Sequence, residues 1–548
     1  MQAAALVRSR DTSMRVLPVT AGFVLVELAD LGETLALLKA MHRDPIAGVG
    51  EIIPAARTLL VQFDSAEISL DALTDVLASR RGADIEKGPG PLVEIPVRYD
   101  GEDLQEVAGL TGTTVDEVVR RHCGRDYLVA FTGFAPGFAY LADGDPRLAV
   151  PRRTSPRTHV PAGSVGLAGA FSGIYPKASP GGWQLIGNTP LTMFDLDRTP
   201  ASLLQPGYRV RFRDMAISAP YEIAQTTRKS PVKAATRKGA AIAAAMEITT
   251  IGLPVLFQDL GRPGQSHHGI GRSGAMDRGS LRAANRLVGN PDGAAALEIV
   301  LGGMGFRMSG RAVMAVSGAP VAITITDANG ARVSAPHNEA FALDEGDRVM
   351  LGVPVAGMRS YLAMRGGFDV APVLGSAATD TLGQIGPPTV LPGDVIPILA
   401  KATGMAISLR QPPAFEMPSV AETVRLDIVL GPRTDWFTQD AVSSFLSQDW
   451  TVTAQSSRVG IRLRGEPLER RNQGELPSEA TVQGAIQVPA SGQPVLFLAD
   501  HPITGGYPVI ANVAWHHLDL AGQIPVGARI RFNANDRFLP RTIPGKQI

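Results

Sequence analysis

The chain has 548 residues, with 52 lysine and arginine residues balanced by 52 acidic ones. This zero net charge argues against a nucleic-acid-binding protein and against a polybasic membrane anchor, since both depend on a basic excess. No apolar run approaches about 18 residues and the first residues lack a signal-peptide core, so neither a transmembrane helix nor a secretory leader is expected. The single cysteine, Cys123, cannot form an intrachain disulfide, which is typical of a reducing cytoplasm.

Residues 1–91 are predicted to form a small α+β domain. Strands are expected over 16–28 and 58–66, where β-branched and apolar residues dominate. Helical spacing of apolar residues covers 32–41 and 69–79. A Gly/Pro-rich break at 87–91 then ends this domain.

Residues 92–223 are predicted to form a β-barrel that begins with a strand at 92–100 and two helices at 104–110 and 113–123. Thr114 is expected to cap the second helix, with Glu117 three residues later. A linker is predicted over 224–245, which holds five positive charges, no acid and otherwise mostly small residues. The sequence from Met246 resembles the start of an independent protein, so we infer that two proteins were fused here.

Several short motifs recur in the same order before and after the predicted linker. Tyr-Leu-x4-Gly-Phe occurs at 127–134 and 361–368, and Gly-x-Arg-[Val/Ile]-Arg-Phe at 207–212 and 527–532, with a looser copy at 346–351. Gly-Gly-aromatic-x-aliphatic-Ile-x-Asn occurs at 181–188 and 505–512. The repeats predict three related β-rich modules, and the Gly/Pro turns between short strands favour closed barrels. The predicted fold class is therefore mainly β with α+β elements.

Residues 131–190 combine many Gly and Pro residues with interleaved polar side chains. Glycines let backbone N–H groups approach a ligand closely. His159 titrates near neutrality and suits proton transfer, whereas Lys177 suits point-charge contact with a carboxylate or phosphate. The alternatives are tight turns between strands, a hydrogen-bonded structural histidine and an ordinary surface lysine.

Residues 258–291 contain Gly269-x-Gly271-x-x-Gly274, a formal dinucleotide fingerprint. The residues before it do not resemble a strand and no βαβ unit follows, so this interpretation is rejected. A helix is expected from near Asp277 or Ser280 to Gly289; its N-terminus could bind an anion or simply pack in the core. His267-His268 and His516-His517 are adjacent pairs that do not place two ligands on one helix face, and no metal site is predicted.

Two groups of longer motifs resemble a known family. FTGFAPGFAYL (131–141), HVPAGSVGLAG (159–169) and YPKASPGGWQLIGNTP (175–190) resemble the B subunit of the bacterial ATP-dependent 5-oxoprolinase, formerly labelled allophanate hydrolase subunit 1. QDLGRPG (258–264), SGAMDRGSLRAANRLVGNP (273–291), YLAMRGGF (361–368) and HPITGGYPVIANVAW (501–515) resemble the C subunit of the same enzyme. Both parts are also similar to the carboxyltransferase domain of urea carboxylase. The resemblance implies a small α+β domain and one cyclophilin-like barrel in a B-like part, and two such barrel modules in a C-like part at 246–548.

The resemblance implies a cytoplasmic hydrolase component that works with a separate A subunit. This component would activate 5-oxoproline with ATP and Mg²⁺ for hydrolysis to glutamate. Opening a stable five-membered lactam is uphill without coupling, and phosphorylation of its amide oxygen would supply a leaving group and an electrophilic carbon. Neither nucleic acid nor membrane is an expected partner, and a homo-oligomer is left open. The alternatives are a biotin-dependent carboxyltransferase acting on urea or a related amide, and a regulatory protein that binds a histidine kinase.

The candidate site residues come from both parts and are expected to meet at the interface between them, since ligand sites favour domain junctions. Lys177 and Arg262 are expected to clamp an anion and His159 to transfer a proton, with Asp259 as a fourth catalytic candidate. Gln258, Asp259 and Arg262 could instead form a structural turn with its own ion pair. The residues expected to contact the nucleotide or substrate are Thr132, Gln184, Asn188, Gln258, His268, Ser273, Asp277 and Asn285.

Overall fold

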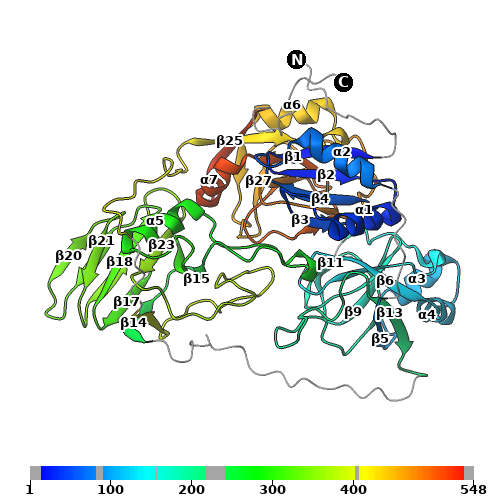
Figure 1. Ribbon diagram of the computed structural model, residues 1–548, viewed down its shortest axis with the longest axis horizontal. Helices are drawn as coiled ribbons and strands as arrows, with labels where there is room; N and C mark the ends of the chain where they lie inside the picture. The colour runs from blue at the N-terminus through cyan, green and yellow to red at the C-terminus, as the bar shows by residue number, and fades with distance from the viewer. Residues whose placement is uncertain (1–13, 82–89, 156, 218–240, 401–405, 536–548) are drawn as a thin grey trace.

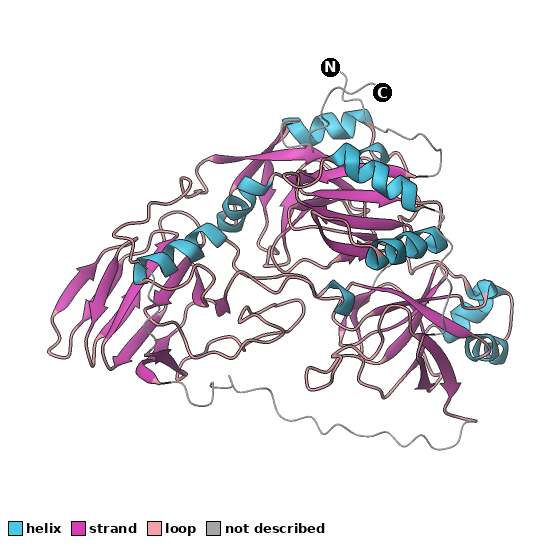
Figure 2. Cartoon of the chain, viewed as in Figure 1, coloured by secondary structure: helices cyan, strands magenta, loops and turns pink. Residues whose placement is uncertain are grey.

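The computed structural model describes residues 14–81, 90–155, 157–217, 241–400 and 406–535. Strands dominate all parts of the chain, and a few short helices lie beside the sheets (Figures 1 and 2). The prediction of a mainly β fold with α+β elements is therefore confirmed. Among the described helices, none is both long and apolar enough to cross a membrane.

The first domain is a four-stranded sheet with order β1-β2-β4-β3 and two helices on one face. Its elements are β1 (Arg15–Thr20), β2 (Phe23–Glu27), α1 (Leu31–Arg43), β3 (Val49–Pro54), β4 (Thr58–Phe63) and α2 (Leu70–Arg80). The single strand predicted over 16–28 is wrong, because the chain turns at Ala21-Gly22 and β1 pairs antiparallel with β2. The helix predicted over 32–41 is α1, whose N-cap Asp30 accepts a hydrogen bond from the Glu33 N–H at 2.9 Å.

Both faces of this first sheet are buried, and they face different parts of the chain. Val24, Val26 and Val61 pack beneath the two helices. Leu25 and Leu60, which point the opposite way on the same strands, pack in a cluster with side chains of the C-terminal barrel. The first domain of the B-like part therefore shares a hydrophobic core with the C-like part, and in Figure 1 the blue sheet lies against the orange strands.

The second module is a seven-stranded, curled sheet with order β12-β9-β10-β7-β6-β13-β5. Its elements are β5 (Leu92–Val97), α3 (Leu104–Thr111), α4 (Val115–Cys123), β6 (Asp126–Thr132), β7 (Ala139–Ala142), η1 (Pro146–Leu148), β8 (Arg157–Val160), β9 (Ser164–Ala168), β10 (Phe171–Ile174), β11 (Ser179–Gly181), β12 (Gln184–Asn188) and β13 (Arg209–Asp214). Thr114 caps α4, as predicted, by accepting a hydrogen bond from the Glu117 N–H at 3.3 Å.

Most of the predicted linker, residues 224–240, lies outside the described residues. Its predicted end is wrong, because residues 242–245 belong to a strand, β14 (Ile242–Thr250), in which Ala245 pairs with Ser309 and Pro397. Alanine-rich composition suggested a spacer, yet Ala244 and Met246 are buried in the next core. The strand's pairing and packing override the weak β-propensity of alanine.

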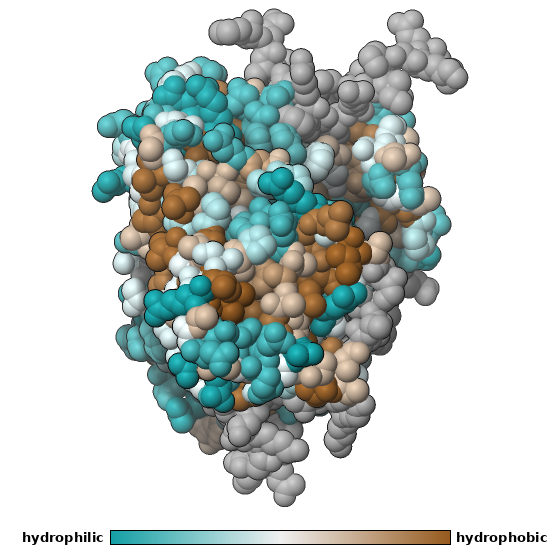
Figure 3. Space-filling model, turned by 90° about the vertical axis from the view of Figure 1, so that its left-hand side faces the viewer, coloured by the Kyte–Doolittle hydropathy of each residue, from teal (hydrophilic) through white to brown (hydrophobic). Residues whose placement is uncertain are grey.

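The third module has a six-stranded sheet, β20-β19-β22-β17-β14-β24, and a five-stranded sheet, β15-β16-β23-β18-β21, which enclose one core. Besides β14, its elements are β15 (Val255–Gln258), η2 (Ser266–His268), α5 (Arg278–Val288), β16 (Ala296–Val300), β17 (Gly305–Ser309), β18 (Ala312–Gly318), β19 (Ile323–Thr326), β20 (Arg332–Ala335), β21 (Ala340–Leu343), β22 (Arg348–Leu351), β23 (Arg359–Met364) and β24 (Val395–Leu399). The face in Figure 3 shows apolar patches between polar ones, and the exposed apolar side chains of this module include Val333, Met350, Val353 and Val355.

The fourth module is a closed barrel of β25-β32-β29-β30-β27-β26-β33. Its elements are β25 (Thr423–Leu430), η3 (Thr434–Trp436), α6 (Gln439–Ser447), β26 (Trp450–Val452), β27 (Gly460–Arg464), β28 (Glu479–Ala480), β29 (Ala485–Gln487), β30 (Val495–Phe497), β31 (Thr504–Gly505), β32 (Val509–Val513), η4 (Trp515–His517), α7 (Leu518–Gln523) and β33 (Arg529–Ala534).

The repeated Gly-x-Arg-[Val/Ile]-Arg-Phe motif has the same structural role in the second and fourth modules. Its two copies run into β13 and β33, the last strand of each module. Each of these strands pairs in parallel with the first strand of its own module, β13 with β5 and β33 with β25. In the fourth module this parallel pairing closes the barrel, whereas in the second it adds β5 at the edge of the curled sheet.

Candidate functional site

One segment of the C-like part, residues 258–268, leaves β15 and crosses to the B-like barrel (Figure 1). At its start, Gln258 is fully buried and its Nε2 donates to the Thr379 carbonyl at 2.9 Å. Asp259 accepts hydrogen bonds from the Ser376 hydroxyl at 2.6 Å and from the Ala377 N–H at 2.7 Å. These two side chains fix the start of a loop, residues 376–387, which we call the junction loop.

Arg262 lies against the same loop and is only 1% exposed. Its Nη2 donates to the Ala378 carbonyl, but Nε and Nη1 have no hydrogen-bond partner among the described residues. Burial lowers the pKa of Arg262, and the charges of Asp380, Asp259 and Asp500 oppose this shift. Unpaired buried N–H groups are costly, so this guanidinium is well suited to receive the oxygens of an anion.

Lys177 reaches the junction loop from the B-like barrel, where it follows β10. Its Nζ donates to the Leu382 carbonyl, so the side chain crosses from one part of the chain to the other. Burial lowers the pKa of Lys177, and the nearby charge of Asp380 opposes this shift. The structure thus brings together Lys177, Arg262, Asp259 and Gln258, four predicted residues from the two parts.

Asp380, which no sequence motif identified, lies between these cations. It is 4% exposed and accepts a hydrogen bond from the Gly383 N–H at 2.7 Å. Burial and the neighbouring charge of Asp500 raise its pKa to about 6, while Arg262 and Lys177 act in the opposite direction. A carboxyl group with a pKa near neutrality can both accept and donate a proton under physiological conditions.

A buried ionic network behind the junction loop ties the fourth module to the third. Asp500 accepts hydrogen bonds from the Ser273 hydroxyl at 2.6 Å and from the Thr381 hydroxyl at 2.7 Å. Arg458 donates from Nε to Asp500 at 2.9 Å and from Nη1 to Glu298. Burial would lower the pKa of Arg458, but the charges of Asp500 and Glu298 outweigh it and raise that pKa. Ser273 therefore supports the junction loop through Asp500.

Thr132, at the end of β6, and His268 lie where the crossing segment meets the B-like barrel. The Thr132 hydroxyl donates to the Ser266 carbonyl at 2.9 Å. His268 is buried, its Nδ1 lies 3.0 Å from the Ser202 hydroxyl, and its carbonyl accepts from the Gly137 N–H at 2.9 Å. Burial, reinforced by His267, lowers the pKa of His268 to about 4. These contacts hold the crossing segment on the B-like barrel.

The remaining predicted residues lie away from the junction loop contacts. His159 is exposed on β8, and Asn188, at the end of β12, donates to the Ala162 carbonyl at 3.2 Å. Gln184 is buried and its Nε2 lies 3.4 Å from Glu106. Asn285 donates to the Ala294 carbonyl at 2.8 Å, where it holds the turn that follows α5.

Asp277 is the N-cap of α5 and is 1% exposed. Its carboxylate accepts hydrogen bonds from the Ser280 N–H at 2.8 Å and from Gln523 Nε2 at 2.8 Å. Burial and the nearby charge of Asp519 raise the pKa of Asp277 to about 6.

The raised pKa of Asp277 predicts a pH dependence of stability. The native state binds this proton more tightly than the unfolded chain, so stability is expected to fall by about 3 kcal/mol as pH rises from about 4 through 6. Asp277→Asn keeps a capping side chain and should remove this slope. Denaturant unfolding of both proteins at pH 4.5 and pH 8 measures the difference, and an equal slope in the two would contradict the assignment.

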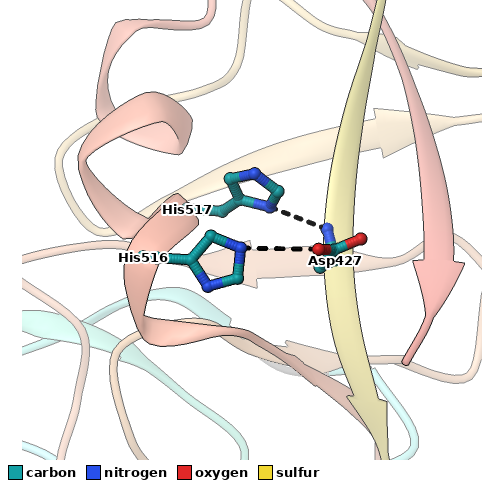
Figure 4. A group of neighbouring side chains, drawn as sticks. All are labelled: Asp427, His516 and His517. Atoms are coloured by element: carbon teal, nitrogen blue, oxygen red, sulfur yellow. Dashed lines mark hydrogen bonds and ion pairs between the residues drawn. The ribbon is translucent and has the colours of Figure 1, made fainter. Parts of the chain in front are cut away.

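Asp427, His516 and His517 form a separate group on the fourth module (Figure 4). His516 Nε2 lies 3.4 Å from a carboxylate oxygen of Asp427, and His517 Nδ1 accepts a hydrogen bond from the Asp427 N–H at 2.9 Å. That backbone bond already uses the Nδ1 lone pair which a metal would need. We therefore interpret the group as a contact that holds η4 against β25.

A large cleft lies between the first domain and the second module. Its volume is about 1370 Å³. Its lining residues are Leu31, Gly32, Leu35, Ala36, Leu38, Lys39, His42, Gly50, Glu51, Ile52, Pro54, Gln62, Gly90, Asp126, Tyr127, Leu128, Val129, Ala130, Thr132, Asp143, Gln205, Pro206, Gly207, Arg209, Pro263, Gly264, Ser266 and His267. The last four belong to the C-like crossing segment, so the cleft is built from both parts of the chain.

Two family models match the chain. The model described as "Carboxyltransferase domain, subdomain C and D" matches residues 12–204, and "Carboxyltransferase domain, subdomain A and B" matches residues 268–534.

Relatives and a solved structure match the chain as well. The chain is 34% identical over 293 residues to the C subunit of 5-oxoprolinase from Escherichia coli K12, covering 52% of this chain and 90% of that protein. It is 39% identical over 187 residues to the B subunit of 5-oxoprolinase from Bacillus subtilis 168, covering 31% of this chain and 78% of that protein. The crystal structure of TTHA0988 is 34% identical, covers 93% of this chain and 100% of that chain, and superposes with a TM-score of 0.77.

Proposed function

Because the chain belongs to the carboxyltransferase-domain family that contains the B and C subunits of 5-oxoprolinase, with a B-like part fused to a C-like part, we propose that it activates 5-oxoproline with ATP for hydrolysis to L-glutamate. In this proposal the ring opening is completed by a separate A subunit. The observation that carries the proposal is the meeting of Lys177, from the B-like part, with Arg262 and Asp380, from the C-like part, around the junction loop.

The unpaired N–H groups of Arg262 suit the carboxylate of the lactam. Nε and Nη1 point to different sides of the guanidinium, so each can donate one charge-assisted hydrogen bond to an anionic substrate. A neutral amide would gain less from this buried cation. The arrangement therefore favours an acidic lactam such as 5-oxoproline over urea.

Lys177 and Asp380 suit the reacting amide. Lys177 offers positive charge from the opposite part of the chain, where it would stabilise the negative charge that accompanies phosphoryl transfer to the amide oxygen. Asp380, with its pKa near 6, can exchange a proton with the lactam nitrogen. The exposed His159 has no role in this scheme.

Mixing the purified chain with the A subunit, ATP and 5-oxoproline tests the proposal. We expect ADP and glutamate to form only when both proteins and the lactam are present. The same assay without 5-oxoproline, or without the A subunit, is the control for uncoupled ATP hydrolysis. If the folded A subunit, in the presence of ATP, gives no lactam-stimulated ADP release, carboxybiotin-dependent transfer to urea or a related amide becomes the better assignment, to be tested by its dependence on carboxybiotin.

A further inference from the structure

The cleft between α1 and β6 is far larger than a five-membered lactam needs. Small-molecule sites commonly enclose about 300–1000 Å³, and this cleft measures about 1370 Å³. It therefore has room for a ligand of nucleotide size.

The wall formed by α1 changes character along its length. Leu31, Leu35, Lys39 and His42 lie at helical spacing and all line the cleft, so they form one stripe on the helix. The two leucines pack at the margin of an apolar cluster that includes Ala55 and Ala56, whereas Lys39 and His42 are exposed. The N-terminal half of the stripe, Leu31 and Leu35, is apolar. The C-terminal half, Lys39 and His42, is polar and carries the positive charge of Lys39.

The opposite wall is β6, where residues 126–130 and Thr132 line the cleft and Leu128 and Ala130 supply apolar side chains. Ser266 closes the gap between the walls. Its N–H donates to Glu51 of the first domain at 3.1 Å, and its carbonyl accepts from Thr132 at 2.9 Å. The cleft is therefore complete only when the crossing segment of the C-like part is in place.

The cleft also adjoins the junction loop contacts through the covalent chain. Pro263 and Gly264 line the cleft, and the residue immediately before them is the buried Arg262. Consecutive Cα atoms lie about 3.8 Å apart, so the backbone of Arg262 lies beside this end of the cleft.

Lys39 is one of very few lysines in the part of the chain that the structure describes. Of the eight lysines in the chain, only Lys39 and Lys177 fall within the described ranges 14–81, 90–155, 157–217, 241–400 and 406–535. Lys177 reaches the junction loop, and Lys39 lines the cleft. Elsewhere in these ranges the basic side chains are arginines and histidines.

We infer that this cleft is the nucleotide site, with the purine ring of ATP between the apolar halves of α1 and β6 and the phosphates toward Lys39 and His42. The inference rests on the proposed function, since ATP is the one reactant of that reaction with both the size and the mixed character of the cleft. Apolar walls hold the base through area burial, and the exposed cation contacts the phosphates.

Equilibrium binding of Mg-ATP to the full chain, measured by calorimetry with neither the lactam nor any other protein present, tests the inference. Ala36 lines the cleft on α1, so Ala36→Trp should fill it and abolish measurable binding. Ala78→Trp is the matched control, because Ala78 is exposed on α2 and does not line the cleft. Lys39→Ala should weaken binding about two- to fivefold, the effect of one exposed charge contact, and Arg43→Ala, one residue beyond His42, should not.

The inference would be overturned if Mg-ATP did not bind to the wild-type chain or if Ala36→Trp bound Mg-ATP as tightly as the wild type. It would also be overturned if inorganic triphosphate competed as effectively as ATP, because binding would then depend on charge alone. The proposed function is judged separately. If Ala36→Trp retains lactam-stimulated ADP release with an unchanged KM for ATP, the proposed function is supported and the assignment of the cleft as the nucleotide site is rejected. If Ala36→Trp abolishes ATP binding but the wild-type protein never hydrolyses the lactam, the cleft assignment is supported and the proposed function is rejected.

Discussion

Replacing Arg458 by methionine is expected to destabilise the fourth module by about 3–5 kcal/mol. The Arg458 side chain is 7% exposed and donates to both Asp500 and Glu298, two carboxylates that are themselves fully buried. Its removal leaves Asp500 without its ion-pair partner in a low-dielectric environment and leaves Glu298 ion-paired only with Arg359 among the described residues, at 3.6 Å from the Arg359 Nε. It also removes a donor to the Gly274 carbonyl. Breaking a buried pair in this way costs far more than the net value of the intact pair.

Urea unfolding followed by tryptophan fluorescence measures this effect, because three of the four tryptophans, Trp436, Trp450 and Trp515, lie in the fourth module. Arg531→Met is the matched control. Arg531 pairs with Asp449 at 2.9 Å, but the two side chains are 39% and 30% exposed, so its loss should cost no more than about 1 kcal/mol. Equal destabilisation by the two variants would show that burial of the network does not determine its energy.

Much of the architecture could be predicted from local sequence. The Gly-x-Arg-[Val/Ile]-Arg-Phe copies locate β13 and β33, and Asp277 with Gly289 brackets α5, because capping and strand pairing depend on residues close in the chain. The packing of the first domain on the C-terminal barrel was missed. A signal for it exists in the consecutive buried residues Leu59, Leu60 and Val61, a run that indicates a strand buried on both faces.

Only some residues of the candidate site could be predicted from the sequence. Lys177 and the Gln258–Arg262 segment lie in long Gly/Pro-rich motifs that single them out. No motif includes Asp380, Asp500 or Arg458, and only tertiary contacts bring Asp500 and Arg458 to the junction loop that holds Asp380. Conversely, His159 stands out in the sequence, yet its side chain is exposed on β8 because the motif around it builds a turn beside the barrel.

Replacing Arg262 by methionine is expected to lower kcat/KM for 5-oxoproline by about 10²–10³-fold in the complete system that includes the A subunit. Methionine retains the length of the side chain and fills the buried space, but it removes the two N–H groups that we assign to the substrate carboxylate. Arg262→Lys restores the charge without the planar array of N–H groups, so it should recover only part of the loss.

The matched control for Arg262 is Arg272→Met. Arg272 lies just after the crossing segment, where its carbonyl accepts from the Arg262 N–H at 2.8 Å, but its own side chain is exposed. We expect near wild-type kinetics for Arg272→Met and a similar modest loss of stability in both variants, since Arg262 also gives up its contact with the Ala378 carbonyl. If Arg262→Met loses stability but keeps its KM for 5-oxoproline, the guanidinium only holds the junction loop, and the substrate carboxylate must bind elsewhere.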